Sequence, residues 1–99
     1  MTKTLLPIGS VVMLKGGSHR LMVAGRIQAC KGVTNVYDYS GVPFPEGMID
    51  SSSMYFFDQE DIERLYFVGM QDEEELKMEE QISNLGELYV NDEGKIVER

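Results

Sequence analysis

The sequence predicts a small α+β domain in which about five antiparallel strands precede a single acidic helix. Short β-branched and aromatic runs alternate with glycine, proline and serine turns over residues 5–69, which is typical of an antiparallel sheet. Helix formers then dominate residues 70–86. The 99 residues predict one domain. Its sheet is either strongly coiled and open or closed into an SH3-like barrel, and residues 87–99 form a terminal hairpin or a frayed tail.

The sheet is organised around the apolar segment Leu5–Gly17, which contains a strand over Ser10–Leu14. A tight turn at Gly16–Ser18 supplies the positive φ angles that a hairpin requires, so Arg20–Gln28 is the expected partner strand. Gly25 interrupts the alternation of apolar residues in this partner. A glycine at such a position predicts a β-bulge or sharp bend, and we expect the sheet to coil there.

A loop over residues 29–35 leads into the third expected strand, Val36–Tyr39. Residues 40–53 then contain Pro43 and Pro45. Because proline has no N–H to donate to a strand ladder, these residues predict a connection that runs over the surface.

Two further strands are predicted, one over Met54–Phe57 and one within Ile62–Val68. Between them, Asp58 is a good helix-capping residue and Asp61 follows three residues later. This spacing predicts one helical or 3₁₀ turn that joins the last two strands of the sheet.

The helix predicted over residues 70–86 has Asp72 as its N-cap and Gly86 as the residue that ends it. Apolar residues recur mainly at i, i+4 and i+7, which is the spacing of one helix face. The resulting stripe consists of Leu76, Met78, Ile82 and Leu85. Because the stripe is narrow, we expect the helix to lie against another part of the molecule rather than inside the core.

Charge is unevenly distributed along the chain, whose net charge is −8. Residues 1–49 contain five Lys/Arg and two Asp/Glu, a net charge of +3, whereas residues 50–99 contain four Lys/Arg and fifteen Asp/Glu, a net charge of −11. This excess argues against nucleic acid as the partner, because phosphate binding needs a cationic surface.

Features of membrane and secreted proteins are missing from the sequence. No apolar run approaches the roughly 20 residues that cross a bilayer, and the N-terminus lacks the apolar region of a signal peptide. The single cysteine, Cys30, cannot form an internal disulfide. We therefore expect a cytoplasmic protein without membrane insertion.

No residue pattern indicates catalysis or metal binding. His19 stands in the expected hairpin turn without a recognisable acid or nucleophile. Cys30 has one cationic neighbour, Lys31, and is better explained as a structural thiol. An acidic cluster lacks the central glycine and final glutamate of a calcium loop; it consists of Asp58, Glu60, Asp61 and Glu63. We expect no enzymatic activity, no metal and no cofactor.

Eight of the nine Phe and Tyr residues fall within residues 37–67. Neighbours such as Phe56–Phe57 and Tyr66–Phe67 point to opposite faces of a strand, so a small sheet cannot bury all the aromatic rings. Either the helix covers the remaining rings, or they form a contact patch for another protein. The residues expected in such a patch are Tyr39, Phe44, Met48 and Tyr66.

The chain resembles an uncharacterised-domain family of Gram-positive bacteria that is encoded beside the LXG effectors of type VII secretion. The resemblance covers about residues 5–80 and rests on the order of several short blocks. These blocks are Leu6–Val12, Leu14–Gly17, Leu21–Val23, Gly25–Gln28, Asp38–Tyr39 with Gly41, Pro45–Gly47, and Phe57 with Asp61 and Ile62.

The resemblance implies a small cytoplasmic accessory protein or chaperone rather than an enzyme. The leading expectation is a non-catalytic protein-binding module that serves as a chaperone or targeting factor for a type VII effector or its helical partner. The alternative is an immunity protein that neutralises a neighbouring toxin, because an acidic surface suits the masking of a cationic site. The oligomeric state is left open.

Overall fold

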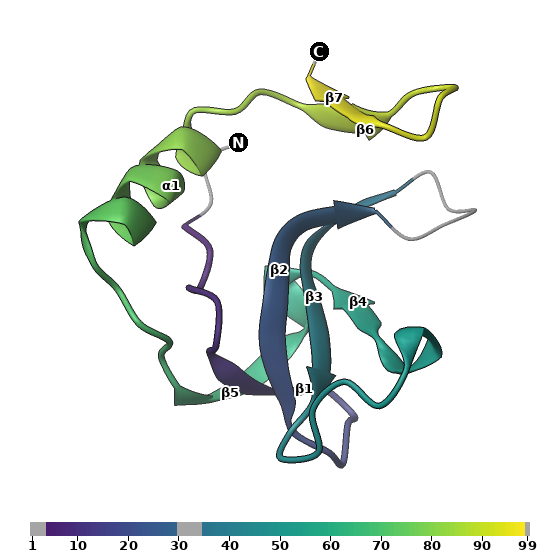
Figure 1. The fold of residues 1–99 in the computed structure, drawn as a ribbon, viewed down its shortest axis with the longest axis vertical. Coiled ribbons are helices and arrows are strands. Elements are labelled where there is room, and N and C mark those ends of the chain that lie inside the picture. Colours follow the sequence, from purple (N-terminus) through teal and green to yellow (C-terminus); the bar gives the residue numbers. More distant parts are fainter. Residues whose placement is uncertain (1–3, 30–34, 99) are drawn as a thin grey trace.

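The protein contains an open five-stranded antiparallel sheet, one α-helix and a C-terminal β-hairpin (Figure 1). The computed structural model describes residues 4–29 and 35–98. The strands lie in the order β4-β3-β2-β1-β5, and neither edge strand pairs with the other. The α+β prediction is therefore confirmed in its open, coiled form, and the closed SH3-like barrel is wrong. The strands are β1 Val11–Leu14, β2 Leu21–Ala29, β3 Val36–Pro43, β4 Tyr55–Phe57 and β5 Ile62–Phe67.

The β1–β2 hairpin and the predicted bulge both lie where the sequence indicates. Gly16 has a φ of 75° in the turn, a conformation that glycine adopts without steric cost. The pairing of β2 with β3 shifts register between Val23 and Gly25. A Cβ added to Gly25 would lie 2.6 Å from Ser40 Oγ, so a side chain here would require neighbouring side chains to move. Figure 1 shows β2 curving strongly along its length.

Strand β3 is longer than the sequence predicted, because residues 40–43 continue the ladder instead of entering a surface connection. Ser40 pairs with Gly25, and Pro43 pairs with Leu21. The N–H of Phe44 donates to Arg20 O at 2.9 Å. Pairs alternate along an antiparallel ladder, so Pro43 occupies a position at which no N–H is required. The proline therefore ends the strand without disrupting it.

Two 3₁₀ turns complete the connections on this side of the sheet, η1 (Ser51–Ser53) and η2 (Gln59–Asp61). The second confirms the predicted turn: Asp58 N–H donates to Asp61 Oδ2 at 2.9 Å, and Gln59 N–H donates to Asp38 Oδ2 at 2.8 Å. These bonds connect η2 to β3 and set the direction in which β5 leaves the turn.

The hydrophobic core lies on one face of the sheet and is closed by the N-terminal segment and the helix. In Figure 1 the N-terminal segment runs between α1 and β2. Ser10 holds this segment in place, because its hydroxyl donates to Pro7 O at 2.8 Å and accepts from Gly69 N–H at 2.9 Å. The buried core residues are Leu5, Val12, Leu21, Val23, Tyr39, Phe57 and Ile82.

Helix α1 spans Glu73–Ser83 and is shorter than the predicted 70–86. Its N-cap is Asp72, as predicted, with Oδ1 accepting from Glu75 N–H at 2.9 Å. Its C-cap is Asn84, so the expectation that Gly86 ends the helix in the C′ position is wrong. The last turn closes earlier, through a hydrogen bond from Asn84 N–H to Glu80 O.

The face that α1 turns toward the sheet also differs from the prediction. Of the expected apolar stripe only Ile82 is buried, whereas Leu76 and Met78 are 55% and 47% exposed. Glu75 and Glu79, which precede Ile82 by seven and three residues, are partly buried instead. A buried ion pair described below turns these acidic residues toward the sheet, and Leu76 and Met78 are left in solvent.

The C-terminal residues form a separate hairpin of β6 (Leu88–Val90) and β7 (Ile96–Glu98). Its turn is closed by hydrogen bonds from Asn91 N–H to Lys95 O and from Gly94 N–H to Asn91 O. The hairpin alternative for the tail is therefore confirmed. Among the residues that the structure describes, no helix combines the length and hydropathy of a membrane span.

Candidate functional site

A hollow of about 530 Å³ opens on the back of the sheet, the face opposite the core. A second hollow of about 300 Å³ adjoins it, and the two share Arg20, Phe44 and Tyr66. We call the larger hollow the aromatic groove. Its lining residues are Gly9, Val11, Arg20, Met22, Phe44, Tyr66 and Phe67.

The floor of the aromatic groove follows from the pleat of β1 and β2. Val11 pairs directly with Met22, while their neighbours Val12 and Leu21 belong to the core. Successive side chains on a strand point to opposite faces, so both strands are apolar on both faces. The second apolar face has no covering layer of secondary structure in the described chain, and Val11 and Met22 form a floor beneath the aromatic rings.

The outer wall of the groove comes from the irregular edge strand β5. Val11 pairs with Phe67 while Val12 pairs with Leu65, so Tyr66 is the extra residue of a β-bulge. Bulges twist an edge strand and redirect a side chain. Tyr66 is 43% and Phe67 60% exposed, and both line the hollow. The expectation that the helix covers these rings is therefore wrong, because α1 packs on the other face of the sheet through Ile82.

Two arginines lie over the aromatic rings of this surface. The guanidinium carbon of Arg20 is 5.1 Å from the ring centre of Phe44 and 5.6 Å from that of Tyr66. The guanidinium carbon of Arg64 is 4.8 Å from the same Tyr66 ring. Cations at these distances are attracted to the ring faces. The hydrogen bond from Phe44 N–H to Arg20 O keeps the first of these pairs side by side.

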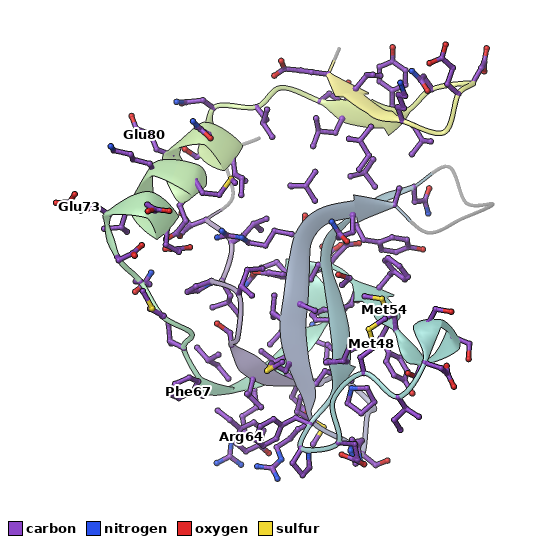
Figure 2. All side chains as sticks on the ribbon, viewed as in Figure 1. Met48, Met54, Arg64, Phe67, Glu73 and Glu80 are labelled. Atoms are coloured by element: carbon purple, nitrogen blue, oxygen red, sulfur yellow. The ribbon has the colours of Figure 1, made fainter. Side chains whose placement is uncertain are left out.

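The four residues expected in a contact patch do not lie together. Phe44 and Tyr66 both line the aromatic groove. Met48 is exposed but does not line the groove, and Figure 2 places it away from Arg64 and Phe67.

Tyr39 does not belong to the exposed contact patch in which it was expected, because its side chain is completely buried. Its ring stacks on Phe57 with centres 5.3 Å apart. Its hydroxyl accepts from Leu6 N–H at 2.7 Å and donates to Gln59 Oε1. Burial raises the pKa of Tyr39 to about 12. Tyr39 therefore has a structural role, in which it joins β3 to the N-terminal segment and to η2.

Reasoning from the sequence missed five of the groove residues, which are Gly9, Val11, Arg20, Met22 and Phe67. A signal for the floor was present, because consecutive apolar residues in the runs at 11–14 and 21–23 must occupy both faces of a strand. No comparable signal marks Arg20, since its stacking depends on β5, which lies more than forty residues away in the sequence.

His19 contacts only one acidic side chain in the part of the chain that the structure describes. His19 is exposed, and its Nε2 lies 2.9 Å from Glu46 Oε1, so it connects the β1–β2 turn to the connection after β3. This hydrogen bond lowers the pKa of Glu46. Cys30 lies outside the described residues. Among those residues, no group of three or more histidine, cysteine or acidic side chains could hold a metal ion.

Comparison with known proteins gives one match. The profile of a family described as a domain of unknown function (DUF4176) matches residues 5–78, which is most of the chain and agrees with the extent of the resemblance noted from the sequence. No curated protein and no solved structure gives a significant match.

Proposed function

The chain belongs to the DUF4176 family of domains of unknown function, and we propose that it is a non-catalytic protein-binding module. The supporting observation is the aromatic groove, in which Phe44, Tyr66 and Phe67 stand over an apolar floor that no helix or strand of residues 4–29 and 35–98 covers. Exposed, contiguous apolar surface rimmed by charge is a feature of protein-binding sites. The volume of about 530 Å³ suits large side chains from one face of a helix or from an extended peptide.

The partner that we propose is a type VII secretion effector or the helical protein that accompanies it. This assignment draws on the resemblance to proteins encoded beside LXG effectors. In this role the domain is a cytoplasmic chaperone or targeting factor, which covers an apolar segment of the effector until export. The aromatic groove supplies a surface on which such a segment can be held reversibly, since its residues already lie on a folded sheet.

Co-purification with the products of adjacent genes tests the proposal. We expect one of these proteins to form a stable complex with the wild-type chain and to be lost from Phe67→Asp, which places a charge in the groove. Ile49→Asp is the matched control, because Ile49 is also strongly exposed and apolar but does not line the groove. Failure of every neighbouring product to bind the wild-type chain would contradict the proposal.

A second candidate function is that of an immunity protein, and the acidic surface of α1 favours it. Glu73 and Glu80 project from this helix into solvent (Figure 2). Such a surface could mask a cationic toxin site electrostatically. Co-expression with a neighbouring toxin separates the two functions. An immunity protein restores growth and loses this effect on Glu73→Gln with Glu80→Gln, whereas a chaperone promotes export and loses it on Phe67→Asp.

A further inference from the structure

We propose that the aromatic groove recognises a carboxylate next to an apolar side chain, so that its partner is a protein presenting an acidic, amphipathic segment. The inference rests on the proposed function and names the chemistry of the partner at the same site. It is carried by the position of two arginines, by the absence of an ion pair of either one among the described residues, and by the apolar hollow that Arg20 lines.

Arg20 and Arg64 approach one tyrosine ring from different strands. Both guanidinium carbons lie within 6 Å of the centre of the Tyr66 ring, and Arg20 is also 5.1 Å from the centre of the Phe44 ring. A guanidinium that lies over an aromatic ring keeps N–H groups available at its edge, where they match the two oxygens of a carboxylate. The Tyr66 ring therefore holds two donor groups near each other, of which Arg20 lines both hollows and Arg64 lies on the same ring.

Neither arginine forms an ion pair in the part of the chain that the structure describes, although Arg20 lies near enough to Glu46 to contribute, after His19, to the lowered pKa of that carboxyl. By contrast, Arg26 is paired with Glu75 at 2.6 Å and His19 with Glu46 at 2.9 Å. The chain has seventeen Asp and Glu residues against nine Lys and Arg, so acidic side chains are abundant. Two unpaired arginines at one aromatic ring thus form a local cationic site on an acidic protein.

The adjoining hollows define where the apolar part of the partner lies. Arg20 lines both the hollow of about 530 Å³ and that of about 300 Å³. A carboxylate bound to Arg20 would consequently have room for an apolar side chain on either side. Val11 and Met22 provide the apolar floor of the larger hollow. A segment in which acidic residues alternate with large apolar residues satisfies both requirements.

Charge distinguishes this partner from a nucleic acid. Phosphate backbones are bound by extended cationic surfaces, whereas the net charge here is −8 and the cationic site consists of the two arginines at the Tyr66 ring. A single carboxylate beside an apolar anchor needs only the local charge.

Fluorescence anisotropy with two synthetic helical peptides tests the inference. Both peptides carry leucine on one face, and they differ only in having glutamate or glutamine beside the leucines. We expect the glutamate peptide to bind the wild-type chain about tenfold more tightly, an advantage that decreases as salt increases. The advantage disappears in Arg20→Gln with Arg64→Gln, and decreases in each single variant. Lys15→Gln with Lys77→Gln, which removes the same charge outside the groove, preserves it.

Several results would overturn the inference. These are equal affinity of the wild-type chain for the two peptides, no binding of either, an unchanged preference in the arginine variants, or tighter binding of a single-stranded oligonucleotide. Self-association that the arginine variants abolish would assign the groove to a second copy of this chain instead. If a neighbouring gene product binds the arginine variant as well as the wild type, the inference fails while the proposed function stands. If the wild-type chain prefers the glutamate peptide but binds no neighbouring gene product, the proposed function fails while the inference about the chemistry of the groove stands.

Discussion

Arg26 Nη1 lies 2.6 Å from Glu75 Oε1, and this ion pair joins β2 to α1 across 49 residues of sequence. The two side chains are only 8% and 11% exposed. The second carboxylate oxygen of Glu75 is buried and has no hydrogen-bond partner, and Glu79 lies on the same face of the helix one turn later. The pair therefore explains why α1 turns an acidic face toward the sheet.

Removal of one member of this pair is expected to destabilise the fold by about 3 kcal/mol, because the other charge remains buried without a counter-ion. Arg26→Met and Glu75→Leu each test this by urea unfolding. The double variant is expected to recover most of the loss, since apolar residues of similar volume can replace a buried pair. Single variants that unfold at the wild-type urea concentration would mean that the pair does not hold the helix in place.

Stability is expected to decrease at alkaline pH through Tyr39. The folded state raises the pKa of this hydroxyl to about 12 from the ordinary value of 10.0, chiefly by burial. A raised pKa means that the folded state holds its proton more tightly than the unfolded state does. The stabilisation is therefore complete below pH 10 and is lost as pH rises from 10 toward 12.

Urea unfolding at a series of pH values measures the effect of Tyr39. Tyr39→Phe is expected to be less stable near neutral pH by about 1 kcal/mol, because Leu6 N–H and Gln59 Oε1 lose a partner. The same variant is expected to lose the Tyr39 contribution to the alkaline decrease. Tyr55→Phe, at an exposed position, is the control. An unchanged alkaline decrease in Tyr39→Phe would assign the effect to other groups.

Glu79→Gln is expected to stabilise the protein slightly near neutral pH. Burial and then the neighbouring Glu75 raise the pKa of Glu79, so its charged form is unfavourable in the folded state. The wild type should gain stability relative to the variant as pH falls through this raised pKa toward 4.5, the ordinary value. We expect a gain of a few tenths of a kcal/mol for Glu79→Gln, as for like charges one helical turn apart. Glu80→Gln, at an exposed position, controls for net charge.

Gly69→Ala is expected to be much more damaging than Gly25→Ala. A Cβ at Gly69 would lie 2.1 Å from the backbone oxygen of Ile8, so the N-terminal segment would have to move. A Cβ at Gly25 would meet side-chain atoms of Ser40 and Gln28, which can rotate away. We expect losses of about 3 and about 1 kcal/mol respectively, measured by urea unfolding. Equal losses of unfolding free energy in the two variants would show that the N-terminal segment can move away from residue 69 at little cost.

Local features of the fold could be predicted because their causes lie within a few residues. The Gly16 turn needs a positive φ, the Gly25 bulge is favoured by a small residue, and the Asp72 cap satisfies a nearby N–H. The predicted end of β3 was too early. A proline is excluded only from strand positions whose N–H donates to the neighbouring strand, and the pairing with that strand decides which positions these are. Pro43 happens to occupy a position that does not donate.

The candidate site could be predicted only in part. The excess of aromatic residues indicated that some rings remain exposed, and Phe44 and Tyr66 are indeed in one groove. Tyr39 was assigned to the wrong face, because period-2 alternation gives two faces but does not say which of them the helix covers. The groove residues Val11 and Met22 were missed for the same reason.

The sequence by itself determined the strands, the turns, the bulge, the helix cap and the division between a weakly basic first half and an acidic second half. These follow from propensity, backbone conformation and charge, which act over short distances along the chain. The tertiary structure decided that the sheet stays open, that α1 covers only one face, and that Arg20, Arg64 and Tyr66 meet on the other. The helix orientation depends on the buried pair of Arg26 with Glu75, and the groove depends on the register of β5 against β1. Both bring together residues that are remote in sequence, and no local pattern encodes them.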